Sequence, residues 1–438
     1  MRVLLFLGTA LLFTLVFADH QEGHHKEGND DDHDHKHDHD HHDHKHDHDH
    51  HDHKDGHHKK GKHHHHNESL PCHKIADYNS KFSFDLYRHV ALDHPSENIV
   101  LSPFNILTAF AFLSLGAKAQ THSQIIEGLR FNTSEISEQE IHECFHNLLV
   151  LLNDVDRELQ LSSGNALFIS KKHKILETFL DKSKKFYHSE AFSTDFKNTE
   201  EARNQINSYV EKNTHGKIAK LLDSVDQDAI LYLISYIYFR GQWQNPFEEE
   251  LTKEGDFHVN KNTTVKVPFM SRTGFYDVAF HNEATLVSIP YKGGAKAYFI
   301  LPNEGELSKV EQNYSKEAFD KWKTSMRNRL VELNLPKFSV SGTVNLKEAL
   351  SKMGLENVFS DSADFSAITE DATIKISKAV HKAVLSVDER GTEAAGATAL
   401  EAIPTLLPPQ IAFNRPFLMT LYNEKSNIFT FSARIVNP

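Results

Sequence analysis

Apolar residues recur every three or four positions from residue 72 onward. Ile75, Tyr78, Phe82, Leu86 and Val90 form such a series, and this spacing predicts a helix over residues 72–92 with one buried face. The same spacing predicts helices at 103–117, 138–153, 175–187 and 199–212. All of these helices fall in the first half of the chain.

Apolar runs of a different kind follow later in the chain. The run AILYLISYIYF at 229–239 has no polar face, which indicates a central strand buried on both sides. The run RPFLMTLYNEKSNIFTFSARIV predicts two strands around a turn at Asn423–Asn427. Further strands are predicted at 297–301, 331–341 and 382–388. Helices early and strands late are typical of an α+β fold.

The chain opens with an apolar segment. In MRVLLFLGTALLFTLVFA, Arg2 precedes an apolar run of 15 residues, Val3–Phe17, and Val16 and Ala18 stand before the expected cleavage point. This arrangement predicts a signal peptide over residues 1–18. The alternative is a membrane anchor, but a spanning helix needs about 20 apolar residues. We therefore expect a secreted, extracellular protein with no membrane partner.

In a secreted protein, asparagine can be glycosylated and cysteine can form disulfide bonds. N-x-[ST] triplets predict glycosylation at Asn67, Asn132, Asn262 and Asn313. The sequence has only two cysteines, Cys72 and Cys144, so a hydrophobic core rather than a disulfide scaffold must hold the fold. The two cysteines either form one disulfide bond or remain free thiols.

Residues 19–71 form a segment of unusual composition. Residues 19–66 contain 21 of the 33 histidines, with 14 acidic residues and 7 lysines, so this arm cannot form a core and is predicted to be disordered. Its alternating imidazoles suit Zn, Cu and Ni, with binding that weakens below pH ~6.5. The alternative is a solvated tail with no selected metal. The predicted ligands are His33, His35, His37, His39, His41, His42, His44, His46, His48 and His50.

Residues 72–438 have the composition of a globular protein. Length alone favours two domains, but no Gly/Ser/Pro-rich linker interrupts this part of the sequence. We therefore predict a single domain over residues 72–438.

The segment HECFH at 142–146 matches the HExxH pattern of zinc proteases. On a helix, His142 and His146 would share one face as zinc ligands, with Glu143 as general base. However, apolar residues between 141 and 152 form the buried face of this helix, and no third ligand follows at an expected spacing. No G-x-S-x-G elbow, phosphate-binding glycine loop or C-x-x-C pair is present. We therefore expect that the protein is not an enzyme.

The segment GTEAAGATALEAIPTLLPP at 391–409 combines features of an exposed loop with those of a β-strand. Pro404, Pro408 and Pro409 mark it as an exposed loop. Between 392 and 402, however, every second residue is small or apolar, and the positions between carry both glutamates. This alternation is that of a strand with one buried face, and small side chains would let it slide between existing strands without overpacking. The loop is therefore predicted to be a latent strand.

Eight short segments, in chain order, share the pattern of one family. They are NIVLSPFNI at 98–106, SYIYFRGQWQNPF at 235–247, VKVPFM at 265–270, LPKFSVSG at 335–342, SKAVHKAVLSVDE at 377–389, GTEAAGA at 391–397, EAIP at 401–404 and FNRPFLM at 413–419. With them the chain resembles the serpins, most closely the alpha-1-antitrypsin type, from about residue 72 to its end.

The resemblance implies a serpin fold of three β-sheets and eight or nine helices, with an exposed reactive loop. It further implies that a serine protease attacks this loop and forms an acyl-enzyme, and that the freed segment then inserts into the main sheet and distorts the protease active site. The implied scissile bond lies between Thr405 and Leu406. The implied hinge consists of Gly391, Thr392, Glu393, Ala394, Ala395, Gly396 and Ala397.

The resemblance also implies two places where the main sheet opens. The shutter residues are Ser102, Asn105, Ser235 and His381, and the residues at the top of the sheet are Trp243, Lys337 and Glu389, the last two as an ion pair. The family pattern has Ser at the position of Asn105 and Asn at that of Ser235. An amide and a hydroxyl can still hydrogen-bond across the same gap, so we expect the shutter to hold.

Two further departures concern partners. The helix predicted at 138–153 is acidic rather than rich in Lys and Arg, so no heparin partner is expected. Thr405 stands where the family member has Met, and its small side chain suits elastase-like pockets. Cleavage one bond later, after Leu406, would favour a chymotrypsin-like protease instead.

We therefore expect a secreted inhibitor of elastase- or chymotrypsin-like serine proteases. The alternative is a carrier, because relatives of this scaffold transport steroids or iodothyronines, and an apolar pocket could take such a ligand or a flat tetrapyrrole such as biliverdin. Thr405 favours the alternative, since a loop released from protease selection could drift to such a residue. The sequence does not locate the pocket. We expect a monomer with no required cofactor and no nucleic-acid partner.

Overall fold

The computed structural model describes residues 72–154, 160–371, 374–390 and 407–438. The chain divides into two units, Met1–His66 and Asn67–Pro438, and all described residues belong to the second. The signal peptide, the histidine arm, Asn67, the hinge at 391–397 and the Thr405–Leu406 bond lie outside the described residues.

Five strands form one sheet, in the order β10–β11–β4–β2–β3. Their bounds are β2 Leu161–Ser170, β3 Glu190–Thr194, β4 Leu231–Arg240, β10 Phe338–Asn345 and β11 Ile376–Val387. β4 runs antiparallel to β2 and parallel to β11. Every residue of β4 except Arg240 is buried, which confirms the central strand predicted at 229–239.

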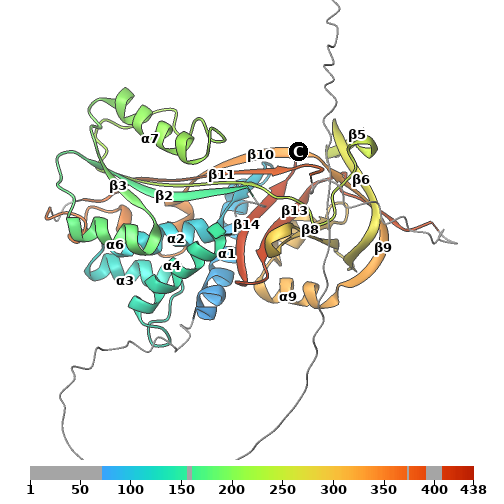
Figure 1. Ribbon diagram of the computed structural model, residues 1–438, viewed down its shortest axis with the longest axis horizontal. Helices are drawn as coiled ribbons and strands as arrows, with labels where there is room; N and C mark the ends of the chain where they lie inside the picture. Colours follow the sequence, from blue (N-terminus) through green and yellow to red (C-terminus); the bar gives the residue numbers. More distant parts are fainter. Residues whose placement is uncertain (1–71, 155–159, 372–373, 391–406) are drawn as a thin grey trace, which may run out of the picture. The chain divides into compact units, whose positions relative to one another are not determined.

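Helices cover both faces of the five-stranded sheet. The helices α2 Pro103–Ser114, α3 Ala119–Gly128, α4 Glu138–Asp154 and α6 Glu177–Tyr187 lie on one face, and α7 Thr199–Asn213 lies on the other (Figure 1). Alternate residues of β2 explain this arrangement, because Leu167 and Ile169 pack with α2 whereas Ala166 and Phe168 pack with α7. The helices predicted at 103–117, 138–153, 175–187 and 199–212 are confirmed, with ends shifted by up to three residues.

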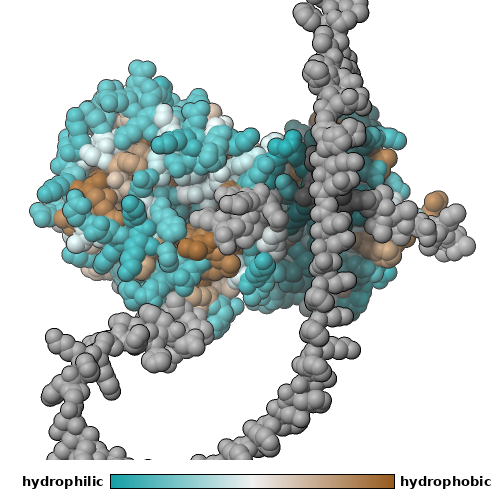
Figure 2. All heavy atoms as spheres, viewed as in Figure 1, coloured by the Kyte–Doolittle hydropathy of each residue, from teal (hydrophilic) through white to brown (hydrophobic). Residues whose placement is uncertain are grey.

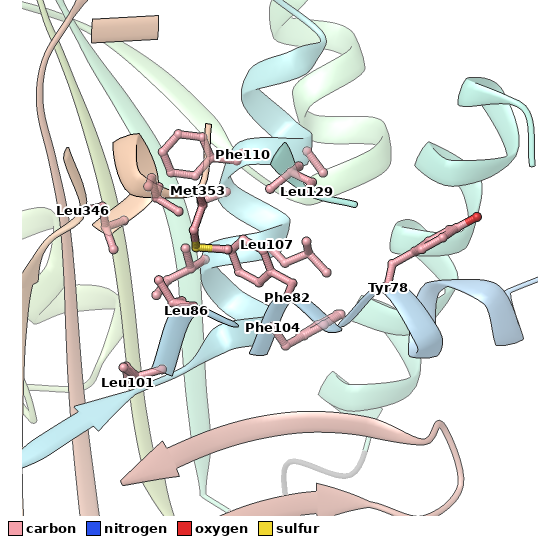
Figure 3. Packing of buried hydrophobic residues seen from close by; sticks show 14 of the residues in the cluster. Tyr78, Phe82, Leu86, Leu101, Phe104, Leu107, Phe110, Leu129, Leu346 and Met353 are labelled. Atoms are coloured by element: carbon pink, nitrogen blue, oxygen red, sulfur yellow. The ribbon is translucent and has the colours of Figure 1, made fainter. Parts of the chain in front are cut away.

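The largest hydrophobic cluster gathers helices from distant parts of the chain. It joins α1 His73–Asp93, α2 and α10 Leu346–Lys352. In Figure 3, Phe82 and Leu86 of α1, Leu107 of α2 and Met353 beside α10 converge on one core. The helix predicted at 72–92 is thus confirmed, and the series of apolar residues that predicted it is buried.

The other strands form a second sheet, in the order β1–β14–β13–β8–β7–β6–β9–β12, with β5 paired to β6. Their bounds are β1 Ile99–Leu101, β5 Lys253–Asn260, β6 Thr263–Phe280, β7 Ala284–Pro290, β8 Ala295–Pro302, β9 Arg327–Pro336, β12 Gln410–Ala412, β13 Phe417–Asn423 and β14 Ile428–Ile435. β6 is 18 residues long and pairs with β5, β7 and β9. Because β6 pairs with β7 as well as with β5 and β9, all of these strands form one continuous sheet. Two of the three expected sheets are therefore joined into one.

The remaining helices are α8 Leu307–Gln312 and α9 Lys316–Ser325, which brings the α-helices among the described residues to nine. The α+β class is confirmed. β13 and β14 flank the predicted turn. The single strand predicted at 331–341 is wrong, because β9 ends at Pro336 and β10 begins at Phe338 in the other sheet. Between them the Lys337 N–H donates to Pro268 O (2.8 Å), and the alternation of apolar residues shifts by one position where the chain changes sheets.

A disulfide bond joins Cys72 to Cys144. Cys72 immediately precedes α1, and Cys144 is a fully buried residue of α4. The bond decides between the two alternatives that the sequence left open. In the described part of the chain, no helix is long and apolar enough to cross a bilayer, and hydrophilic residues cover most of the face drawn in Figure 2.

Candidate functional site

The parallel pair β4–β11 includes the strand that precedes, in the sequence, the segment predicted to be a latent strand. The paired residues of β11 run from Ile376 to Ser386, and β11 ends at Val387, four residues before Gly391. On its other side β11 is paired antiparallel with β10. Parallel pairing is slightly less stable per residue than antiparallel pairing, so β4–β11 is the weaker of the two interfaces of β11.

The predicted shutter residues are in contact at the middle of the β4–β11 pair. His381 is fully buried, and its Nε2 accepts a hydrogen bond from the Ser102 backbone N–H (2.9 Å). Since Nε2 is the acceptor, the neutral ring carries its proton on Nδ1 and donates it to Ser235 Oγ, 2.9 Å away. Burial lowers the pKa of His381 to about 3, so the ring is neutral at physiological pH.

Asn105 connects the same group to α2. Its Nδ2 donates to Ser235 Oγ (2.9 Å) and to Tyr236 O (3.0 Å), so the expected amide–hydroxyl bond is present. Ser102 caps α2, with its Oγ accepting from the Asn105 backbone N–H (3.2 Å). The first residues of α2 thus bind β4 through Asn105 and β11 through His381.

Trp243 follows β4 in the sequence and contacts the residues that follow β11. The side chain is fully buried, its indole N–H donates to Asp388 O (2.7 Å), and its ring stacks on Tyr291 with centroids 3.9 Å apart. The Trp243 backbone N–H also donates to Arg390 O (3.0 Å). Residues 388–390 are therefore held on the segment that follows β4.

Glu389 and Lys337 form the expected ion pair, with Glu389 Oε2 2.8 Å from Lys337 Nζ. The Glu389 side chain is only 4% exposed, whereas that of Lys337 is 45% exposed. Glu389 Oε1 also accepts a hydrogen bond from Thr252 Oγ1 (2.8 Å). Burial raises the pKa of the Glu389 carboxyl group, but the hydrogen bonds from Lys337 and Thr252 outweigh burial, and the pKa lies below its usual value.

Sequence reasoning missed a second ion pair at this end of the sheet. Arg240 Nε donates to Asp388 Oδ2 (2.7 Å), and the Asp388 side chain is 9% exposed. The two residues meet because the register of β4 and β11 places Arg240 opposite Ser386. That register is a long-range property, and a single sequence carries no signal for it.

The two histidines of HECFH have different partners. His142 is buried, with Nδ1 2.5 Å from Tyr187 Oη and Nε2 3.4 Å from Glu138 Oε1. His146 instead faces His188, with 3.2 Å between His146 Nδ1 and His188 Nε2. Burial and the neighbouring His146 lower the pKa of His188. The structure does not bring His142 and His146 together as a zinc-protease motif requires.

The remaining predicted positions are on the surface. Asn132, Asn262 and Asn313 are exposed, as a glycosylation acceptor must be. A cavity of about 530 Å³ lies beside the end of β5, lined by apolar residues such as Val259 and Pro416 and by polar ones such as His258 and Arg415.

Comparison with known proteins gives a consistent result. A serpin (serine protease inhibitor) family profile matches residues 77–438. The chain is 48% identical over 373 residues to alpha-1-antiproteinase of Callosciurus caniceps, covering 85% of this chain and 90% of that protein. It is 47% identical over 377 residues to alpha-1-antitrypsin of Sus scrofa, covering 86% and 90%.

The solved structures that share this fold include a thyroxine-binding globulin and a kallistatin. Human thyroxine-binding globulin superposes with a TM-score of 0.78 at 39% identity, covering 84% of this chain and 99% of that one. Human glycosylated kallistatin superposes with a TM-score of 0.77 at 37% identity, covering 84% and 99%.

Proposed function

The chain belongs to the serpin family, and we propose from this premise that it is a suicide-type inhibitor of elastase- or chymotrypsin-like serine proteases. The proposed bait is the loop at 391–406, with the scissile bond between Thr405 and Leu406. The single observation that carries the proposal is the parallel pairing of β4 with β11, the strand that precedes this loop in the sequence.

Insertion of the loop would exchange one interface for two. A segment that turns back after β11 runs antiparallel to β11, and it runs antiparallel to β4 as well because those strands are parallel. One parallel interface is then replaced by two antiparallel ones, which hydrogen-bond better. Cleavage at Thr405 frees 15 residues from Gly391 onward, enough to cover the 12 residues of β11.

The shutter and the top of the sheet supply the barrier to this exchange. Before β4 and β11 can part, the bond between His381 and Ser235 must break, and the hydrogen bonds of α2 to one of the strands must also break. Trp243 holds the chain between β11 and the hinge. These buried polar contacts keep the uncleaved protein in a higher-energy state, as kinetic trapping requires.

Incubation with a panel of elastases and chymotrypsins, followed by a denaturing gel, tests the proposal. The wild-type chain is expected to form a complex that survives denaturation. Ala394→Arg, on the face of the latent strand that must be buried, is expected to be cleaved without complex formation. Ala395→Arg, on the opposite face, is the matched control and is expected to keep the complex. Clean cleavage of the wild type by every protease in the panel would contradict the proposal.

The cleavage position distinguishes the two protease classes. The released carboxyl-terminal peptide, identified by mass spectrometry, is expected to begin at Leu406 for an elastase-like target and at Leu407 for a chymotrypsin-like one. Leu407, the first described residue after this segment, is 96% exposed.

The second candidate function is that of a carrier of a small hydrophobic ligand. The likeness to thyroxine-binding globulin, whose structure was solved in complex with its ligand, favours it. The cavity of about 530 Å³ beside β5 has the size of a typical ligand site, and a steroid, an iodothyronine or a tetrapyrrole such as biliverdin is the proposed cargo. Protein purified from its native fluid is expected to absorb light as the cargo does, and to release the cargo into an organic extract. A colourless, empty preparation speaks against a carrier.

We further propose that the protein is secreted and glycosylated, and that the histidine arm binds Zn, Cu or Ni. Calorimetric titration of the full chain against a chain lacking residues 19–66 tests the arm, because the arm is expected to account for most of the metal uptake. Equal uptake by both chains would contradict this proposal.

A further inference from the structure

His146 and His188 face each other across the surface between α4 and α6. The distance from His146 Nδ1 to His188 Nε2 is 3.2 Å, and the ring planes are inclined by 75°. Two Zn–N bonds of about 2.0–2.1 Å at a tetrahedral angle place their nitrogen atoms about 3.3 Å apart. The two imidazoles therefore already have the separation of two ligands of one metal ion.

The fold holds both histidines in place through the residues that precede them. Phe145 and Tyr187 are buried, and their ring centroids are 5.7 Å apart. His188 caps α6 in a left-handed conformation, with φ 50°, and its backbone N–H donates to Lys184 O (3.2 Å). One residue before Phe145, the disulfide bond fixes α4 to the start of α1. Little conformational freedom remains to be lost when a ligand binds the pair.

Both imidazoles are accessible to solvent, and among the described residues neither ring has a competing partner. His188 is exposed and His146 is half-buried. Within the described part of the chain, each ring hydrogen-bonds only to the other. This contrasts with His142, whose nitrogens are taken by Tyr187 and Glu138.

We propose that His146 and His188 form a binding site for one Cu²⁺, Ni²⁺ or Zn²⁺ ion. Neutral imidazole suits these ions, and Cu²⁺ is expected to bind most tightly. In the described residues no group of three or more His, Cys, Asp or Glu side chains is placed to hold a metal. Water therefore completes the coordination, and the ion exchanges readily. The ion links α4 to α6 and is independent of the histidine arm and of protease inhibition.

Unfolding of the full chain in urea, with and without each metal, tests this site. Metal bound by the arm, which the sequence predicts to have no fold of its own, is held equally by folded and unfolded chains and does not shift the equilibrium. Metal bound by His146 and His188 is held only by the folded chain. At a free metal concentration of about 100 times Kd, the folding equilibrium constant is expected to rise about 100-fold.

The variants separate the pair from other histidines. His146→Gln retains a good helix former, and His188→Asn retains a residue that tolerates a left-handed conformation. Each is expected to abolish the metal-dependent rise. The matched control is His258→Gln, which removes a histidine from an exposed position of β5 and is expected to leave the rise unchanged. An equal rise in all four proteins, no rise in the wild type, or an equal rise with Mg²⁺ overturns the proposal.

Chemical modification provides a readout that does not depend on the variants. Cu²⁺ is expected to protect both His146 and His188 of the wild type from diethyl pyrocarbonate, as measured by peptide mass spectrometry. His258 should remain reactive in the same sample. Modification of His146 and His188 at unchanged rates overturns the proposal.

Discussion

Mild acid is expected to destabilise the native protein through His381. In the folded state burial lowers the pKa of this residue to about 3, whereas an imidazole in an unfolded chain has a pKa of about 6.5. Between these values the unfolded state binds more protons, so stability is complete above pH ~6.5 and falls as the pH falls below it. Integration of this difference gives a loss of about 2 kcal/mol of unfolding free energy between pH ~7.5 and pH ~5.

The His381→Gln variant isolates this effect. Glutamine retains an acceptor for the Ser102 N–H and a donor for Ser235 Oγ, but it does not titrate. The unfolding free energies of both proteins are to be measured by urea denaturation at a series of pH values. Other histidines, including His122, whose pKa is raised by its hydrogen bond to Glu138, contribute equally to both proteins. The wild type minus variant difference is expected to fall by about 2 kcal/mol from pH ~7.5 to pH ~5. A difference that does not change with pH would refute the reasoning.

Three other substitutions test the contacts around the sheet. Lys337→Met leaves the buried Glu389 carboxylate without its ion pair; because Lys337 is half exposed, we expect a loss of only about 1 kcal/mol at neutral pH. Since the pKa of Glu389 is lowered, this loss should disappear as the pH falls below ~4 in urea titrations. Trp243→Phe removes a buried hydrogen bond and is expected to lower the unfolding free energy by about 1–2 kcal/mol, measured by circular dichroism. Cys144→Ala opens a disulfide loop of 72 residues and should cost about 4 kcal/mol; reductant should then lower the melting temperature of the wild type, where Cys72 is paired, but not that of the variant.

Local periodicity predicted most elements because burial of one helix face or of a whole strand leaves a local pattern. It failed at Lys337, where β9 and β10 were predicted to be one strand although they belong to different sheets, because apolar residues alternate with polar ones on both sides of Pro336. Amphipathic spacing could not show that His146 meets His188 rather than His142, because that contact depends on how two helices pack. Elements are thus visible in short windows of sequence, and their partners are not.

The family resemblance predicted which residues form the candidate site. The hydrogen bonds between them could be predicted from the donors and acceptors that their side chains carry. Donor and acceptor counting sufficed to expect the bond between Asn105 and Ser235. The ion pair of Arg240 with Asp388 was missed because it depends on the register of two strands. Residues 391–406, which include the hinge and the proposed scissile bond, lie outside the described residues.

The disulfide bond links two groups of helices that noncovalent packing also brings together. α1 packs against α2 and α10, and α4 packs against α6. Because Cys72 immediately precedes α1 and Cys144 lies in α4, the bond joins these groups covalently. In a reducing environment this link is lost, and the start of α1 is then held to α4 by side-chain packing alone. The compartment in which the chain resides thus bears on the stability of its helical layer.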